Sequence, residues 1–515
     1  MEDLKPTKEQ QSAVVAFASK QTFKINAYAG TGKTATLAMM AHSSGRQGLY
    51  IAFNKSIADE AGRKFPSHVK ALTSHSLAYR AVKSQGFSNE QMTKSFTPKA
   101  LAYVMQLSPL PYGDGKRLTP VSVAYLVLST LNKFSQSALE QVSPDLVPLY
   151  GYLAALSEKE QHDLQLIVCS LANKLWGWMI DPSAEKFPLG HNGYFKLWSL
   201  SKPTLNSDYC LLDEAQDSNP ALLSVLGQQG CQVVYVGDRF QQIYGWRGAV
   251  NAMELVEVDA TLQLSQSFRF GPAVADFATK VINTLDPSVA ITGNMEISSC
   301  VGCADPDAIL SRTNAQLIAY VIDSLNAGRL PHVVGGTSEM QSMLQDVGKL
   351  KLGQPATHHE FFGFRRWEDI LEYVKQPEGQ SLSTFVSIVE KHGEEKLVQE
   401  LKRTQSEELD ADLILSTAHK AKGREWGSVM VAEDFSEPIE VKPDNREALI
   451  ARGNEICRAK NGKEYAVGPE EMRLLYVAAT RAKSAVHLPS WCERFFGVKQ
   501  SVEAIRFGSQ SSSKY

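Results

Sequence analysis

The first 80 residues alternate short apolar runs with helical patterns, and this alternation restricts the folds open to the chain more than any other feature. The apolar runs lie at 23–26, 48–53 and 69–73, and a helical pattern follows each of them. This strand–helix rhythm predicts a parallel sheet with helices on both faces. Strand-like runs return at 209–212, 232–236 and 261–264, so we expect the same sheet to resume there.

The rest of the chain predicts a second α/β domain and two insertions. Strand-then-helix patterns recur at 308–326, and further strand-like runs lie at 412–417 and 428–432, whereas 83–199 looks helical and 337–410 is charged and leans to helix. We therefore expect these parts: a first α/β domain (1–82 with 200–275), a helical insertion (83–199), a second α/β domain (276–336 with 411–507), a reduced insertion (337–410) and a disordered tail (508–515).

The net charge and the distribution of apolar residues exclude some classes of protein but do not indicate a binding partner. The 515 residues carry 53 Lys and Arg against 56 Asp and Glu, a net charge of −3, so any nucleic-acid surface must be local. The amino terminus lacks a positively charged segment followed by an apolar one, and no apolar run reaches the roughly 20 residues of a membrane span. We expect an intracellular protein with no membrane partner.

A phosphate-binding loop is predicted between the first strand and the first helix that follows it. Its residues are Ala27, Tyr28, Ala29, Gly30, Thr31, Gly32, Lys33 and Thr34, with Ala27 where a first glycine is common. Such a loop turns backbone N–H groups and a helix amino terminus towards phosphates. Lys33 supplies positive charge, and the Thr34 hydroxyl is a ligand for Mg²⁺. ATP and Mg²⁺ are the expected cofactors.

Two adjacent carboxylates end the strand at 209–212. Asp213 is placed to hold the metal, and Glu214 to act as the general base for an attacking water. A second loop, 237–248, follows the strand at 232–236 and mixes an amide, aromatic rings and a cation. Gln241 in this loop is a candidate for sensing the γ-phosphate, and its aromatic residues are candidates for stacking on bases.

Motifs in a fixed order carry a resemblance to a known family. They lie at 7–10, 27–34, 53–56, 73–77, 213–217, 241–248, 266–269, 311–315, 417–426 and 475–482. Together they resemble superfamily 1 helicases of the Rep/UvrD/PcrA type. The stretch His191-Asn192-Gly193-Tyr194-Phe195-Lys196-Leu197-Trp198 makes the chain most similar to the helicase region of the eukaryotic F-box DNA helicases. The resemblance implies two RecA-like parallel-sheet motor domains with helical insertions.

The resemblance also implies roles for individual residues at the nucleotide. Gln10 would read the adenine edge, Phe268 would stack on the base, and Glu425 would approach the ribose. Around the γ-phosphate the resemblance places three cations, Lys33, Arg269 and Arg481, the two arginines acting as fingers from opposite sides of a cleft. Because phosphoryl transfer needs little covalent chemistry from the protein, such cations should dominate its rate.

The candidate residues for contact with a nucleic-acid strand also sit at family motifs. They are Asn54, Lys55, His75, Tyr244, Trp246, Arg247 and His419. Single strands are held by phosphate contacts and by base stacking, for which these side chains are suited.

The expected function is an ATP-dependent DNA helicase that moves 3′ to 5′ on single-stranded DNA and unwinds duplex in repair, recombination or replication. Its direction is implied by the resemblance alone. Expected partners are single-stranded DNA and duplex junctions, with a nuclease or a repair or recombination protein as a further candidate. Two alternatives remain open: a translocase that strips proteins from DNA without unwinding it, and a nucleotide-gated subunit that works with a nuclease in defence. RNA also remains open as the bound strand.

Overall fold

The computed structural model describes residues 5–500 except 114–115, 151–152, 155, 246–249, 303–304, 355, 362–363, 376–381 and 460–461. Contacts between Cα atoms divide the chain into two compact units. The first unit comprises Met1–Ala27 and Gly32–Leu264, and the second comprises Tyr28–Thr31 and Ser265–Tyr515. The tail predicted at 508–515 lies outside the described residues.

The first unit is built on a six-stranded sheet in which all neighbouring strands are parallel. Its order is β3 (Val69–Thr73), β2 (Gly48–Ala52), β6 (Tyr209–Leu212), β7 (Gln232–Gly237), β1 (Phe23–Ala27) and β8 (Ala260–Leu264). Strands from before and after the long central stretch therefore lie in one sheet. This confirms that the sheet interrupted after β3 resumes at β6.

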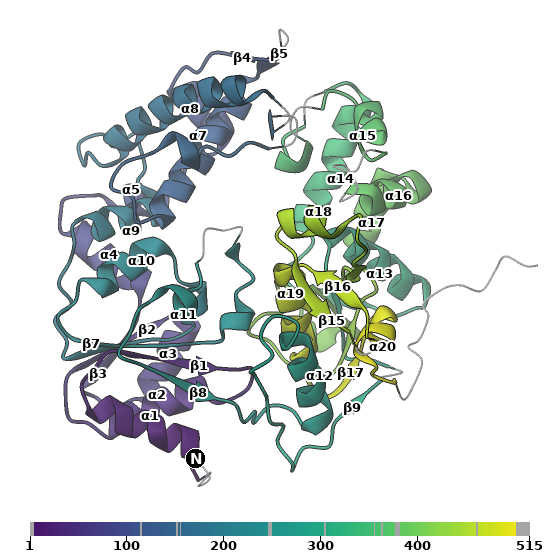
Figure 1. The fold of residues 1–515 in the computed structure, drawn as a ribbon. Helices are drawn as coiled ribbons and strands as arrows, with labels where there is room; N and C mark the ends of the chain where they lie inside the picture. Colours follow the sequence, from purple (N-terminus) through teal and green to yellow (C-terminus); the bar gives the residue numbers. More distant parts are fainter. Residues whose placement is uncertain are drawn as a thin grey trace, which may run out of the picture. The chain divides into compact units, whose positions relative to one another are not determined.

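Helices cover both faces of this sheet. On one face lie α1 (Lys8–Ala18), α2 (Lys33–His42) and α3 (Lys55–Lys64), and on the other α10 (Pro220–Gly227) and α11 (Ala252–Leu255) (Figure 1). Successive strand residues point to opposite faces, so each strand contributes to two cores. The core beside α1–α3 holds Tyr50, Leu211 and Val234, and the opposite core holds Ile51, Leu212 and Tyr235. Burial on both faces explains the continuous apolar runs of these strands.

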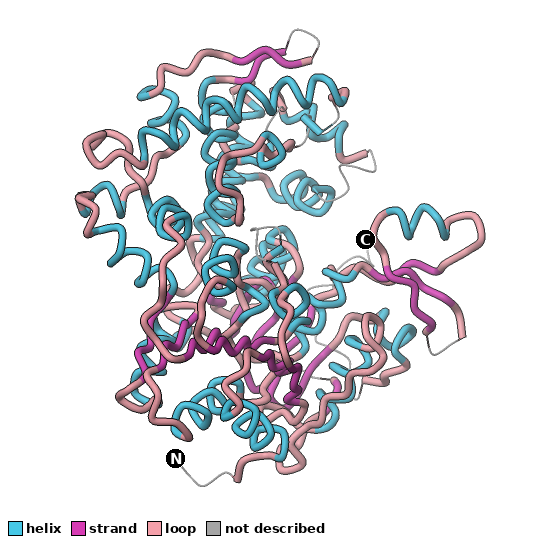
Figure 2. The backbone as a smooth tube through the Cα atoms, turned by 60° about the vertical axis from the view of Figure 1, so that its left-hand side comes forward, coloured by secondary structure: helices cyan, strands magenta, loops and turns pink. Residues whose placement is uncertain are grey.

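The stretch between β3 and β6 is mostly helical. After α4 (Ser74–Lys83) it forms α5 (Asn89–Thr93), α6 (Pro98–Val104), α7 (Pro120–Gln136), α8 (Glu158–Met179) and α9 (Gly190–Leu200). Hydroxyl side chains of Ser88, Thr97, Thr119 and Ser157 cap the amino termini of α5 to α8. A short hairpin, β4 (Leu110–Tyr112) and β5 (Lys116–Leu118), interrupts the helices, and its strands are magenta in Figure 2.

The second unit contains another six-stranded sheet with parallel neighbours. Its order is β11 (Pro331–Val333), β12 (Leu413–Thr417), β10 (Ala308–Ser311), β13 (Trp426–Val431), β17 (Ala482–His487) and β9 (Cys300–Val301). Further helices of this unit are α12 (Pro272–Ile282), α13 (Asn314–Asn326), α19 (Pro469–Ala479) and α20 (Trp491–Phe496). The two parallel sheets confirm the predicted α/β class.

Two smaller parts complete the second unit. Between β11 and β12 the chain forms α14 (Ser338–Lys351), α15 (Trp367–Tyr373), α16 (Ser383–His392) and α17 (Glu394–Leu401), in the stretch predicted to lean to helix. Between β13 and α19 it forms an antiparallel sheet that the sequence patterns did not predict: β14 (Ile439–Glu440), β15 (Glu455–Arg458) and β16 (Glu464–Val467), with α18 (Arg446–Ala451).

Among the described residues, no helix combines the length and the apolar character needed to cross a membrane.

Candidate nucleotide and nucleic-acid site

The loop between β1 and α2 has the backbone of a phosphate-binding loop. Gly30 and Gly32 adopt left-handed conformations with φ of +74° and +76°, and α2 begins directly afterwards at Lys33. A β-carbon on Gly30 would come within 2.4 Å of Ser267 Oγ and 2.6 Å of Arg269 Cβ. Glycine is therefore required here both by backbone conformation and by space.

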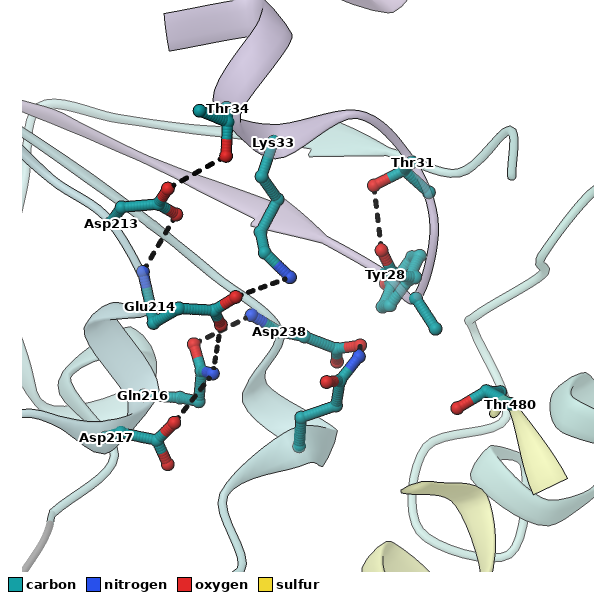
Figure 3. Close-up of polar contacts among 12 residues, drawn as sticks. Tyr28, Thr31, Lys33, Thr34, Asp213, Glu214, Gln216, Asp217, Asp238 and Thr480 are labelled. Atoms are coloured by element: carbon teal, nitrogen blue, oxygen red, sulfur yellow. Dashed lines mark hydrogen bonds and ion pairs between the residues drawn. The ribbon is translucent and has the colours of Figure 1, made fainter. Parts of the chain in front are cut away.

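Around the start of α2, the first unit brings together the residues predicted to hold a metal. Thr34 Oγ1 donates a hydrogen bond to Asp213 Oδ2 over 3.1 Å, and Tyr50 OH donates to the same oxygen over 2.7 Å. The other oxygen, Asp213 Oδ1, accepts from the backbone N–H of Glu214 over 2.9 Å. Asp213 is buried, with 4% of its surface exposed. The carboxylate is thus oriented by donors on three different segments, of which Figure 3 shows the contacts with Thr34 and Glu214.

Glu214 lies between the phosphate-binding loop and the next turn. Its Oε1 is 3.4 Å from Lys33 Nζ, and its Oε2 accepts from Gln216 Nε2 over 2.6 Å. The residue has a left-handed backbone with φ of +51°, which is uncommon for a side chain other than glycine. Such conformations persist where the surrounding structure enforces them, and they gather at functional sites.

A hydrogen-bonded chain runs from Glu214 to the loop after β7. Gln216 donates to Glu214 and accepts from the backbone N–H of Asp238 over 3.0 Å. Asp238 Oδ2 in turn accepts from Gln241 Nε2 over 2.7 Å. Gln216, Asp238 and Gln241 are all buried. A β-carbon on Gly237 would lie 2.3 Å from Gln216 Oε1, so the glycine makes room for this connection.

Burial and charge act together on the two acids. Burial, and then the neighbouring charge of Glu214, raise the pKa of Asp213, while Lys33 and the Tyr50 hydroxyl act in the opposite direction. Burial, followed by the charge of Asp213, raises the pKa of Tyr50, so the phenol stays a hydrogen-bond donor. Two carboxylates facing one ammonium leave an excess of negative charge, which a divalent cation would offset.

The donor set fits Mg²⁺. A hydroxyl and a carboxylate oxygen from Thr34 and Asp213 are hard ligands, and Mg²⁺ is usually bound by one or two protein carboxylates together with substrate phosphates and water. Within the described ranges, no group of three or more His, Cys, Asp and Glu side chains is arranged to enclose a metal. A site of this kind suits a cation that arrives with a nucleotide.

Gln10 lies in the first turn of α1, where its side chain takes part in the helix cap. The Gln10 Oε1 accepts from the Thr7 N–H over 3.0 Å, and the Thr7 hydroxyl accepts from the backbone N–H of Gln10. The Gln10 Nε2 donates to Thr36 Oγ1 over 3.2 Å. Only 3% of the residue is exposed. These contacts fix the amide against α2, and one lone pair and one N–H remain for another partner.

In the second unit, the residues predicted to meet the nucleotide cluster around Arg269. Its Nε lies 2.7 Å from Glu425 Oε2, and its Nη1 donates to the carbonyl of Thr480 over 3.2 Å. Lys483 binds the other oxygen of Glu425 over 2.9 Å. Burial acts to raise the pKa of Glu425, but Lys483 and Arg269 hold it below its usual value. Phe268 is half-buried, and its N–H donates to the Gly30 carbonyl over 2.8 Å.

Arg481 is buried at the end of α19, with 1% exposed. Its guanidinium donates to the carbonyls of Val477 and Arg424 and to the Thr480 hydroxyl, over 2.9, 3.3 and 3.2 Å. Nearby on the same helix, the Tyr476 hydroxyl accepts from the Ala29 N–H over 2.9 Å. The guanidinium is thus fixed largely by backbone and hydroxyl oxygens.

The candidate strand-binding residues of the first unit lie at one edge of its sheet. Asn54 and Lys55 follow β2 and are exposed, and Asn54 caps α3 by accepting from the Ile57 N–H. His75 lies just after β3, the neighbouring strand, and stacks on Phe195 of α9 at 4.9 Å and 15°. Ligands of open α/β sheets bind at this carboxyl edge.

The remaining strand-binding candidates are less fully defined. Tyr244 follows Gln241 and is half-buried, and His419 follows β12 in the second unit and is also half-buried. Trp246 and Arg247 lie outside the described residues.

Sequence patterns missed Tyr50, Gln216 in its bridging role, and Asp238. Tyr50 lies in the middle of an apolar strand and meets Asp213 only because β2 and β6 are neighbours. Asp238 and Gln216 meet because β6 and β7 are neighbours. For Gln216 and Asp238 the signal available was their place shortly after the end of a strand, and Tyr50 offered none.

Known proteins match both parts of the chain. The UvrD-like helicase C-terminal domain matches residues 364–493, and an AAA domain matches residues 10–247. In these two parts the chain is similar to UvrD-like helicases and to AAA domains. The phosphate-binding loop and the acidic pair lie in the part of the chain that matches the AAA domain.

Individual relatives extend this similarity over the whole chain. F-box DNA helicase 1 of Gallus gallus is 30% identical over 562 residues, covering 100% of this chain and 53% of that protein. F-box DNA helicase protein 1 of Schizosaccharomyces pombe is 28% identical, covering 93% of this chain and 56% of that protein. ATP-dependent DNA helicase PcrA of Leuconostoc citreum is 38% identical over 84 residues, 15% of this chain and 11% of that protein. The chain spans about half the length of the two F-box relatives.

Proposed function

We propose that this chain is an ATP-dependent DNA helicase that translocates 3′ to 5′ on single-stranded DNA and unwinds duplex. The observation that carries the proposal is the cluster of Lys33, Thr34, Asp213 and Glu214, held together at the end of β1 and β6. The names of its relatives support DNA as the substrate, and its resemblance to the Rep/UvrD/PcrA type supports the direction.

The four residues have separate tasks in ATP hydrolysis. Thr34 and Asp213 would hold Mg²⁺, which offsets the negative charge of the phosphates when bound. Glu214 accepts the proton of the attacking water, and its Oε1 lies 3.4 Å from the Lys33 ammonium. Lys33 lies at the amino terminus of α2, where the helix dipole and free N–H groups also favour phosphate.

The remaining nucleotide contacts in this proposal follow the family pattern. Arg269 and Arg481 meet the charge on the γ-phosphate, and Glu425, which binds Arg269, meets the ribose. Phe268 stacks on the base, and the side-chain amide of Gln10, which also donates to Thr36, hydrogen-bonds to adenine. Arg269 would exchange its present contact with Glu425 for a stronger one with phosphate, because bidentate arginine–phosphate pairs are among the strongest charged hydrogen bonds.

A physical link connects hydrolysis with the strand. The Glu214–Gln216–Asp238–Gln241 chain leads from the general base to the loop that carries Tyr244. When the γ-phosphate leaves, the partners of Glu214 change, and the buried amide of Gln216 transmits that change along the chain. We assign strand contact to Asn54, Lys55, His75, Tyr244 and His419, and to Trp246 and Arg247 beyond the described residues.

We propose the predicted domain boundaries as the motor organisation. The two α/β domains at 1–82 with 200–275 and at 276–336 with 411–507 would be the motor domains. The helical segments at 83–199 and 337–410 would be their insertions.

ATP hydrolysis with and without single-stranded DNA, followed by strand displacement from 3′-tailed and 5′-tailed duplexes, tests the proposal. We expect DNA to stimulate hydrolysis, only the 3′-tailed duplex to separate, and Lys33→Ala to abolish both. Hydrolysis indifferent to DNA would overturn the motor proposal and favour a nucleotide-gated subunit. Stimulated hydrolysis without displacement would select a translocase. Competition by single-stranded RNA distinguishes the two nucleic acids.

A further inference from the structure

The first unit has a cavity that the nucleotide site does not use. It measures about 570 Å³ and is formed where α4 packs against α9. Its lining residues are His75, Ser76, Tyr79, Arg80, His191 and Tyr194. The α9 residues belong to the stretch 191–198, which carried the resemblance to one branch of helicases and has no part in ATP hydrolysis.

The chemistry of the lining suits an anion. It offers one guanidinium, two imidazoles and three hydroxyls, and these six lining side chains include no carboxylate. Arg80 and His191 are exposed, and Tyr194 is buried. An anion in this cavity would meet hydrogen-bond donors from two helices and no carboxylate among the lining residues.

Aromatic packing holds these donors in place. His75 stacks on Phe195, and Tyr194 meets the rings of His75, Tyr79 and His191 edge-on at 5.9, 5.6 and 5.6 Å. The Tyr194 hydroxyl lies 3.1 Å from His191 Nδ1. Burial, followed by the charge of Tyr79, raises the pKa of Tyr194, so its hydroxyl keeps its proton.

The two histidines that line the cavity also interact electrostatically. Burial lowers the pKa of His75, and the charge of His191 lowers it further, while the amide of Asn192 acts in the opposite direction. Two imidazoles close enough to repel one another when protonated would both be stabilised by an anion between them.

The position of the cavity identifies the source of the anion. His75 follows β3, and Asn54 and Lys55 follow the adjacent strand β2, with Ala52 paired to Thr73 at the ends of the two strands. The cavity therefore adjoins the sheet edge assigned to strand contact. The rings of Tyr79 and Tyr194 add apolar surface beside the donors, as single-strand sites do.

We propose that the α4–α9 cavity binds a phosphodiester group of the single strand, with Arg80 and His191 as the principal donors. This inference rests on the proposed function, because it takes the strand to lie along the first unit. It adds α9 to the strand-binding surface and gives the stretch 191–198 a role in holding nucleic acid.

The test is binding of fluorescent oligo-dT by the full chain across a range of salt concentrations, followed by anisotropy. Each phosphate contact on a single strand contributes about 0.7 to the slope of log affinity against log salt. We expect Arg80→Gln to weaken binding about tenfold and to lower the slope by about that amount. We expect His191→Gln to weaken binding by a smaller factor, and Arg80→Lys to restore most of the slope.

Matched controls lie in the same unit. Arg63 on α3 and His162 on α8 are exposed and do not line the cavity, so Arg63→Gln and His162→Gln should leave both affinity and slope unchanged. Thermal unfolding at an unaltered midpoint shows that the cavity variants are folded. Inorganic phosphate and free dTMP serve as competitors, which should displace oligo-dT only at much higher concentration.

The outcomes separate the two claims. If the unaltered chain binds oligo-dT and both cavity variants match it in affinity and slope, the inference is overturned while the proposed function stands. If the unaltered chain binds no oligo-dT, both fail. If free phosphate competes as well as oligo-dT does, the cavity is a small-anion site and the strand assignment is wrong.

Discussion

At the scale of single residues, Glu214 is the side chain whose chemistry can be isolated most cleanly. It contacts Lys33 and Gln216 and is not itself one of the proposed metal ligands, which are Thr34 and Asp213. Glu214→Gln keeps the shape and one acceptor oxygen but removes the base. We expect ATP hydrolysis to fall at least about 100-fold while ATP binding persists. Steady-state hydrolysis and binding of a fluorescent ATP analogue measure the two effects.

The control for this change is Glu60→Gln on the exposed face of α3, whose carboxylate pairs with Lys64. It should leave the rate of hydrolysis unchanged. A Glu214→Gln protein that hydrolyses ATP at nearly the normal rate would show that another group activates the water.

Tyr50 is a second residue with a measurable role, because its hydroxyl donates to the buried carboxylate of Asp213. Tyr50→Phe removes that donor and leaves a buried acceptor less satisfied. We expect the free energy of unfolding to fall by about 1–3 kcal/mol. Chemical denaturation monitored by circular dichroism measures it, and the concentration of Mg²⁺ needed for half-maximal hydrolysis should change as well.

Tyr209 provides the matched control on the adjacent strand β6. It is fully buried, and among the described residues its hydroxyl has no hydrogen-bond partner. Tyr209→Phe should therefore cost no stability, since it removes an unsatisfied polar atom. Equal losses in the two variants would show that the Tyr50–Asp213 contact is not the source of the effect.

At the scale of elements, the phosphate-binding loop depends on glycine more than on any side chain. A β-carbon at Gly30 would meet both a left-handed backbone and the Ser267 hydroxyl. We expect Gly30→Ala to lower the free energy of unfolding by at least about 1–3 kcal/mol and to suppress ATP hydrolysis. Gly45→Ala is the control, because no atom lies within 4 Å of its added carbon. Equal stabilities of the two variants would contradict this account of the loop.

The elements that the sequence predicted are those with long, local patterns. β2, β6 and β7 are largely apolar because both faces of their sheet are buried, and α7 and α8 have clear helical periodicity with capping residues. The strands it missed are β17, which has six residues, and β4, β5, β9, β11 and β14 to β16, which have two to four. Segments of two to four residues have no measurable period, and the pairing of β9, β11 and β17 depends on distant partners.

The same distinction applies to the candidate site. The contact between Thr34 and Asp213 was expected from two motifs, each recognisable by itself. To predict the Gln216–Asp238–Gln241 connection one must know that β6 and β7 are neighbours in the sheet. To predict the cavity one must know that α4 and α9, which are more than 100 residues apart, pack together. Motifs thus predict which residues form the site, whereas the residues that hydrogen-bond to them are determined by long-range packing.

At the scale of the whole molecule, the two compact units have separate hydrophobic cores. Leu175 of α8 belongs to a core of the first unit, and Leu344 of α14 to a core of the second, and both are fully buried. Because each core lies within one unit, we expect calorimetry to resolve two unfolding transitions.

Leu175→Ala and Leu344→Ala identify these transitions. Each leaves a cavity that costs about 2–5 kcal/mol, which corresponds to a midpoint lower by roughly 5–15 °C for a unit of this size. Leu175→Ala should move one transition and Leu344→Ala the other, since neither side chain contributes to the opposite core. If either substitution moved both transitions equally, the two units would unfold as one cooperative body. A motor whose hydrolysis changes contacts in one unit would then transmit that change through the shared stability of the whole chain, rather than through local connections such as Glu214–Gln216–Asp238.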